Sequence, residues 1–124
     1  MNGLTRVVLR LGRNPDQGYP EGDDHIGYVL QAPLDKDGYL SSVLWRAKRE
    51  DCTVRRFHTH ETPATGWLRC RGDNWYFLYD DGDEGPEEPV FKLGAHRLAA
   101  GEYVTIREAD GEVMTFRVVE TQAV

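Results

Sequence analysis

Two histidines separated by one residue are the first feature of this sequence that can do chemistry. His58 and His60 end the segment T-V-R-R-F-H-T-H (residues 53–60), whose composition predicts a β-strand. Residues two apart on a strand send their side chains to the same face, so these two imidazoles can share a metal ion. A complete metal site needs further ligands, and the candidates are His96, His25 and Glu61.

The neighbours of this histidine pair favour a different interpretation. Arg56 lies on the same face and places a cation beside the supposed metal. Phe57 has the opposite parity, and we expect its ring to pack in the core, which leaves the histidines on the outside. The alternative is therefore a pair of solvated histidines, because this spacing without a third fixed ligand is a weak signal.

A basic and aromatic set of residues forms the second candidate site. Five cations fall within eleven residues: Arg46, Lys48, Arg49, Arg55 and Arg56. The strand pair that follows adds two aromatic and two basic residues on one face. Arginine beside exposed aromatic rings is how sheet surfaces bind single-stranded nucleic acid, by stacking the bases and neutralising the phosphates. We therefore predict a binding surface that consists of Arg55, Trp67, Arg69, Arg71 and Tyr76.

The alternative for this surface is purely structural. Arginine side chains can cover aromatic rings with their aliphatic stems and pair with the many carboxylates of the chain. The net charge of −6 also argues against nucleic acid, because such binders normally carry an excess of basic residues.

Two predicted β-hairpins position these residues. If Gly72 and Asp73 form a two-residue loop, Cys70 faces Trp75 and Leu68 faces Phe77 on one apolar face, and the basic and aromatic residues occupy the other. In the C-terminal hairpin a three-residue loop, Ala109-Asp110-Gly111, sets Ile106 against Met114 and Val104 against Phe116. A one-residue slip would mix apolar and polar residues on both faces, so the pattern selects this register.

The remaining segments complete a mainly β chain. Alternating residues predict strands over Thr5–Leu11 and Ile26–Gln31, and Ser41 or Ser42 can cap a short helix that extends to about Glu50. The acidic stretch 80–89 predicts a loop, and 90–93 predicts a short strand. These elements predict one β domain over residues 1–124: an antiparallel small barrel or sandwich of about seven strands with one short helix.

Composition limits the compartment and the partners. No apolar run approaches the length of roughly 18 residues that a membrane span requires, so we expect no membrane partner. The N-terminal residues alternate like a strand rather than a signal peptide. With only Cys52 and Cys70, we expect a cytoplasmic protein whose two thiols are buried and reduced.

Two segments resemble known families. H-T-H at residues 58–60, followed by the predicted hairpins, is loosely similar to the cupins, whose motifs supply HxH, a glutamate and a further histidine. His58 and His60 match HxH, whereas Ala64 and Thr65 stand near the glutamate position, and residues 113–115 stand near the last histidine. This likeness implies a β-barrel. The segment F-K-L-G-A-H-R-L-A-A-G-E-Y-V-T-I-R-E-A-D-G-E-V-M-T-F-R-V-V resembles a small family of proteobacterial proteins with no assigned activity, which implies a bacterial cytosolic protein.

The sequence therefore predicts a binding or interaction module rather than an enzyme, with an unknown ligand or protein partner and no cofactor required by any motif. One alternative is a degenerate cupin-like protein that binds metal through His58, His60 and His96. The other is a protein that binds single-stranded nucleic acid through the aromatic and basic face.

Overall fold

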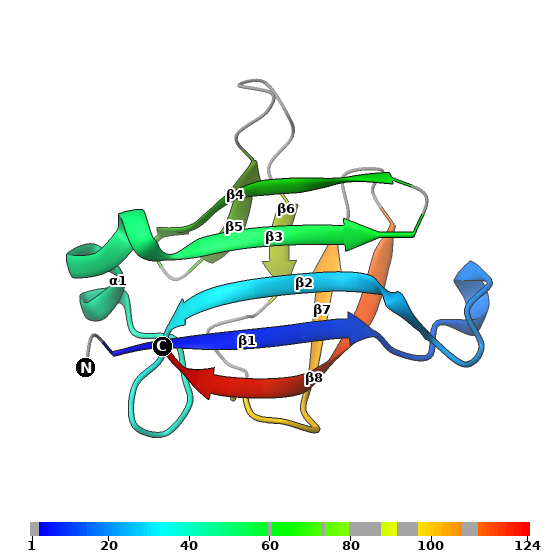
Figure 1. Cartoon of the computed structure of the whole chain (residues 1–124), viewed down its shortest axis with the longest axis horizontal. Coiled ribbons are helices and arrows are strands. Elements are labelled where there is room, and N and C mark those ends of the chain that lie inside the picture. The colour runs from blue at the N-terminus through cyan, green and yellow to red at the C-terminus, as the bar shows by residue number, and fades with distance from the viewer. Residues whose placement is uncertain (1–2, 60, 73, 80–87, 92–96, 108–111) are drawn as a thin grey trace.

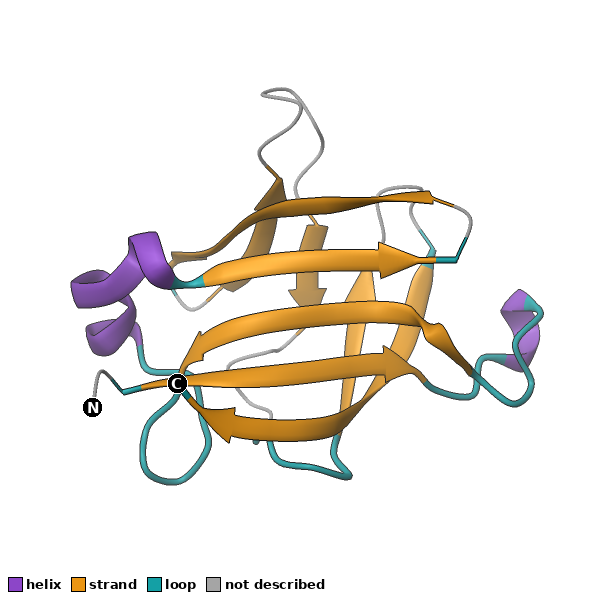
Figure 2. Cartoon of the chain, viewed as in Figure 1, coloured by secondary structure: helices purple, strands orange, loops and turns teal. Residues whose placement is uncertain are grey.

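Strands dominate the computed structural model, which describes the chain except for residues 1–2, 60, 73, 80–87, 92–96 and 108–111. The described residues form eight strands: β1 (Leu4–Leu11), β2 (Asp23–Pro33), β3 (Thr53–His58), β4 (Glu61–Arg71), β5 (Asn74–Tyr79), β6 (Glu88–Phe91), β7 (Tyr103–Arg107) and β8 (Val113–Ala123). One α-helix, α1 (Ser42–Lys48), and two short 3₁₀ helices, η1 (Pro15–Gln17) and η2 (Arg49–Asp51), complete the described elements (Figure 2).

Each strand pairs with the next in antiparallel fashion, and β1 also pairs with β8, so the sheet closes into a barrel. Strands β1 to β4 run side by side across the front, with β5, β6 and β7 behind them at a steep angle (Figure 1). The predicted antiparallel small barrel with a short helix is confirmed, with eight strands in the described residues where about seven were expected. Closure also leaves no long unpaired edge.

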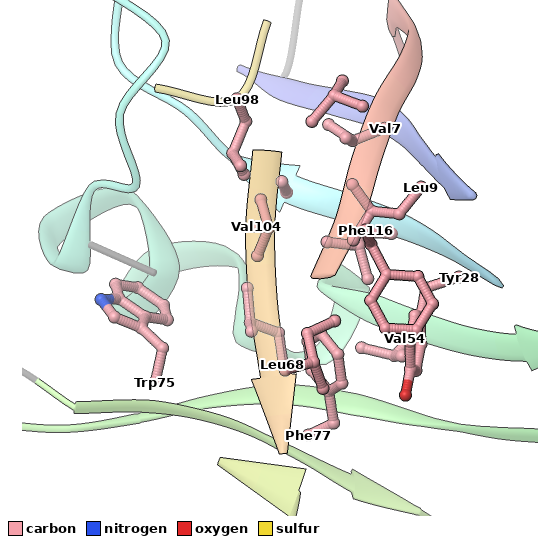
Figure 3. Packing of buried hydrophobic residues seen from close by; sticks show 14 of the residues in the cluster. Val7, Leu9, Tyr28, Val54, Leu68, Trp75, Phe77, Leu98, Val104 and Phe116 are labelled. Carbon is pink, nitrogen blue, oxygen red and sulfur yellow. The ribbon is translucent and has the colours of Figure 1, made fainter. Parts of the chain in front are cut away.

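The inward face of the strands is apolar and fills the barrel. Tyr28, Phe77 and Phe116 meet at its centre, with ring centroids 5.2 Å apart for Tyr28 and Phe77 and 5.1 Å apart for Tyr28 and Phe116 (Figure 3). Leu9 and Leu30 are also fully buried. Buried and outward residues alternate along β7 and most of β8, as closed barrels of this size require, whereas β1 and β2 each bury three consecutive residues.

Both predicted hairpin registers are confirmed. In β4 and β5, Leu68 pairs with Phe77 and Cys70 pairs with Trp75, and Gly72 has the positive φ of 64° that the tight turn needs. In β7 and β8, Val104 pairs with Phe116 and Ile106 pairs with Met114, and the inward residues of this hairpin are buried. The predicted loop 109–111 lies outside the described residues, as does most of the predicted acidic loop, whose last two residues, 88 and 89, begin β6 instead.

The predicted helix is confirmed, and it covers one end of the barrel. The Ser41 hydroxyl caps α1 by accepting a hydrogen bond from the amide of Leu44, at 3.1 Å. Trp45 lies edge-on against Trp75, with ring centroids 6.2 Å apart, and its indole N–H donates to the carbonyl of Leu68 at 2.8 Å. The helix is thereby fixed to β4 and β5.

Candidate functional site

Strand β3 places Phe57 on the side opposite to the one that we predicted. Val54 is buried and pairs with the buried Leu30, and Arg56 pairs with the buried Tyr28, so these two residues of β3 face the interior. Phe57 is half-buried and pairs with Gly27. The prediction that Phe57 packs in the core is therefore wrong, whereas the placement of the two histidines is not decided, because His58 is half-buried and His60 lies outside the described residues.

Gly27 provides the physical reason for this reversal. A Cβ atom at Gly27 would lie 2.8 Å from Cζ of Phe57 and 1.9 Å from the carbonyl oxygen of Leu9. The missing side chain therefore makes room for the Phe57 ring on the outer wall of the barrel. An outward aromatic ring can be structural when it covers a glycine.

The predicted metal ligands are only partly within the described residues. His58 is half-buried and lies beyond a register shift in the pairing of β3 with β4, so the alternation of β3 does not assign it a face. His60 and His96 lie outside the described residues. His25 is exposed, with Nδ1 3.4 Å from a carboxylate oxygen of Asp23. No group of three or more metal-binding side chains occurs among the residues that the structure describes. The histidine metal site stays a prediction.

The predicted basic and aromatic residues of the second hairpin come together on its outer face. Trp67 pairs with Leu78 and Arg69 pairs with Tyr76, all on the side opposite to the buried Leu68 and Phe77. We call Trp67, Arg69, Arg71 and Tyr76 the outer hairpin face.

One pair on this face is held by direct contacts. A guanidinium nitrogen of Arg71 donates to the hydroxyl of Tyr76 at 2.9 Å, and its Cζ atom lies 5.1 Å from the centroid of the Tyr76 ring. This cation–π arrangement holds both groups at the surface.

Trp67 is half-buried and lies between two grooves on the outer wall of the barrel. The first groove, of about 470 Å³, crosses β1 to β4 and is lined by Arg6, Gln31, Thr53, Arg55 and Thr65 besides Trp67. Arg55 pairs with Thr65, so the structure places it on the same side as the outer hairpin face, as predicted. The second groove, of about 500 Å³, is lined by Arg49, Glu50, Trp67 and Arg69.

The electrostatics of the two grooves differ. In the first, Arg6 is paired with Glu120 at 2.8 Å, and the Gln31 amide donates to the carbonyl of Asp51 at 2.6 Å. In the second, the Nε atom of Arg69 is buried and has no hydrogen-bond partner among the described residues. A buried donor without an acceptor is costly, and a ligand oxygen could satisfy this N–H only after the atoms that cover it move aside.

Sequence reasoning missed Arg6 and Gln31, which other strands contribute to the first groove. It also did not predict that Arg49 lies beside Trp67. The outward parity of Arg6 was readable from the alternation of β1. The order of the strands around the barrel was not, and this order decides which outward residues become neighbours.

Neither cysteine forms a disulfide. Cys52 is fully buried, and burial, with a further contribution from the charge of Asp51, raises the pKa of its thiol to about 11. Its Sγ atom lies 3.4 Å from the carbonyl oxygen of Lys48. A protonated, inaccessible thiol of this kind is a packing group and a poor nucleophile. Cys70 is half-buried, so the prediction that both thiols are buried is confirmed only for Cys52.

Comparison of the chain with models of known protein families, with curated proteins and with solved structures gives no match. Among the described residues, no helix has the length and apolar character needed to cross a membrane. The function must therefore be argued from the site.

Proposed function

We propose that this protein is a binding module and that it takes its ligand on the outer wall of β3, β4 and β5. The observation that carries the proposal is the position of Trp67, which projects outward between two grooves that both carry arginine. Tryptophan and arginine are the residues that most often dominate binding energy at interfaces.

The chemistry of the face favours a ligand with both planar and anionic groups. The half-buried rings of Trp67 and Tyr76 offer stacking surfaces, and Arg55 and Arg69 offer guanidinium groups on either side of Trp67. Single-stranded nucleic acid combines these two features in every nucleotide, and proteins bind it through the same residue types. Arg69 in the second groove supports this class, because a guanidinium pairs well with phosphate oxygens.

The surrounding charges suit a local patch rather than a basic protein. The whole chain is acidic, with a net charge of −6, whereas the outer wall around Trp67 gathers Arg49, Arg55 and Arg69 against one lining carboxylate, Glu50, besides Arg6, which is paired with Glu120. We therefore expect binding to be confined to this face and to weaken steeply with salt.

We also propose a reducing, cytoplasmic compartment in a bacterial cell. The low cysteine content, two residues of which Cys52 is fully buried, supports this compartment, because domains of oxidising compartments are often rich in disulfides. The resemblance of residues 91–119 to the proteobacterial family supports the bacterial source.

The test is a fluorescence-anisotropy titration of a labelled oligothymidylate of about 12 nucleotides at low salt. We expect Trp67→Ala to weaken binding by roughly 5- to 150-fold, which corresponds to a stacking contribution of about 1–3 kcal/mol. We expect Arg69→Gln to weaken it by about tenfold, since it removes a charged hydrogen bond.

Two matched controls lie away from the face. Tyr39→Ala removes another exposed aromatic ring, and Arg107→Gln removes another exposed arginine, on β7, which lines neither groove. Both should bind like the wild type. Equal binding by all four variants, or no binding by the wild type at low salt, would contradict the proposal.

A further inference from the structure

A third groove lies on a different part of the outer wall, where β7, β8 and β1 meet the segment between β1 and β2. It has a volume of about 560 Å³. Its lining includes three arginines, one aromatic ring and one hydroxyl: Arg10, Arg13, Arg117, Tyr103 and Thr115. We call it the three-arginine groove.

The sheet places two of these arginines directly opposite each other. Arg10 on β1 pairs with Arg117 on β8, and Arg117 also pairs with Tyr103 on β7. All three have outward parity, because their neighbours Leu9, Leu11, Val104, Phe116 and Val118 are buried. Like charges at directly opposed positions destabilise a strand pair.

Among the described residues, no carboxylate forms a salt bridge with these cations. Glu21 and Asp24 line the same groove, but no carboxylate oxygen of the described residues lies within 4.0 Å of a guanidinium nitrogen of Arg10, Arg13 or Arg117. Arg10 instead donates to the backbone carbonyl of Asp24, at 2.8 Å. The groove therefore holds three guanidinium groups that form no salt bridge with a carboxylate of the described residues, and two carboxylates, Glu21 and Asp24, that line it at longer range.

The wall beside these arginines is fixed. Asn14 is buried, with 6% of its surface exposed, and its side-chain amide donates to the carbonyls of Gly12 and Thr115, each at 3.0 Å. The same side chain accepts a hydrogen bond from the amide of Thr115, also at 3.0 Å. These bonds tie the segment that carries Arg13 to β8, so the backbone positions of the arginines are set before any ligand arrives.

We propose that the three-arginine groove binds a phosphate dianion, either inorganic phosphate or the phosphate group of a monoester. A guanidinium presents paired N–H donors that match the oxygens of phosphate, and a dianion placed between Arg10 and Arg117 removes their repulsion. Glu21 and Asp24 at the same groove favour a compact anion over a long polyanion. Tyr103, 55% exposed beside Arg117, offers a ring or a hydroxyl to the ester group. This site is separate from the outer hairpin face and does not depend on it.

The test uses thermal unfolding of the full chain in potassium phosphate and in potassium chloride of equal ionic strength. We expect phosphate to raise the melting temperature of the wild type above its value in chloride, because a ligand that binds only the folded state stabilises it. Isothermal titration with phosphate should then show Arg10→Gln and Arg117→Gln to bind about tenfold more weakly or worse.

A second readout separates binding from a structural role. In chloride, Arg117→Gln should melt at the same temperature as the wild type or higher, because it removes a like-charge pair. The control Arg46→Gln should keep the full phosphate effect. Equal melting temperatures of the wild type in phosphate and in chloride, or an unchanged phosphate effect in both groove variants, would overturn the proposal.

A further titration identifies the form of the phosphate. Phenyl phosphate that binds more tightly than inorganic phosphate, with the difference lost in Tyr103→Ala, would support the monoester. Equal affinities would support inorganic phosphate. None of the groove variants changes Trp67 or its neighbours. A failure of the phosphate proposal therefore leaves the nucleic-acid proposal intact, and a failure of the nucleic-acid proposal leaves the phosphate proposal intact.

Discussion

The two faces of the β4–β5 hairpin each carry a tryptophan and a second aromatic residue, in contrasting surroundings. On the inner face, Trp75 is 6% exposed and meets Trp45 edge-on, and Phe77 is fully buried against Tyr28. On the outer face, Trp67 and Tyr76 are half-buried, and their neighbours are arginines. One strand pair thus carries a packed wall and an open wall.

This difference shows how to tell a structural ring from a ring available to a ligand. The inner rings pack against aromatic rings of other elements and are enclosed by the core. The outer face retains a buried Arg69 donor without a partner among the described residues. Exposure alone is not enough, because Phe57 is also outward and yet occupies the space above Gly27. The distinguishing feature is whether polar groups around the ring lack hydrogen-bond partners.

The largest expected effect is on the inner face. Phe77→Ala should lower the free energy of unfolding by about 3–5 kcal/mol, because it leaves a cavity beside Tyr28. Tyr76→Ala, one residue away on the outer face, should cost far less. Urea unfolding of both variants measures the contrast, and equal costs would remove the distinction between the two walls.

Gly27 tests whether the Phe57 ring is structural. Gly27→Ala should destabilise the fold by about 3 kcal/mol, the upper end for overpacking, because the new Cβ meets the backbone oxygen of Leu9. The double variant Gly27→Ala/Phe57→Ala should recover part of this loss by removing the second contact. Full stability of Gly27→Ala in a thermal melt would show that the Phe57 ring does not fill this space.

The pH dependence of stability tests whether Cys52, just before β3, is buried inside the barrel. Its folded-state pKa of about 11 lies above the ordinary value of 9.0, so the neutral thiol stabilises the fold below pH 9, and this contribution is lost as the pH rises through 11. The loss should be on the order of 2 kcal/mol. The measurement compares the free energy of unfolding of the wild type with that of Cys52→Ala between these pH values. If the two proteins lost stability with pH equally, the result would contradict the burial of this thiol.

The parts of the fold that the sequence predicted are those that two adjacent strands and their turn determine together. The hairpin registers followed from Gly72 and from the separation of apolar and polar faces. In β3 the pattern T-V-R-R-F-H places Val54 and Phe57 on opposite sides, so it is compatible with either parity, and only Gly27 on the neighbouring strand decides between them.

The candidate site was predictable to a similar extent. Four of its residues lie on one hairpin, and their common face was predicted. The contributions of Arg6 and Arg49 depend on the order of strands around the barrel and on where η2 packs, which are contacts between distant parts of the chain. The opposition of Arg10 and Arg117 depends on the pairing of β1 with β8, and no local pattern indicates it.

The most direct test of the central claim compares the two tryptophans of this hairpin, since the claim is that Trp67 serves a ligand and not the fold. Unfolding of Trp67→Ala and Trp75→Ala should be measured under identical conditions. We predict a loss of about 3–5 kcal/mol for Trp75→Ala, as for other large core deletions. We predict about 1 kcal/mol or less for Trp67→Ala, as for substitutions outside the core. A loss for Trp67→Ala as large as that for Trp75→Ala would make Trp67 a structural residue and contradict the account.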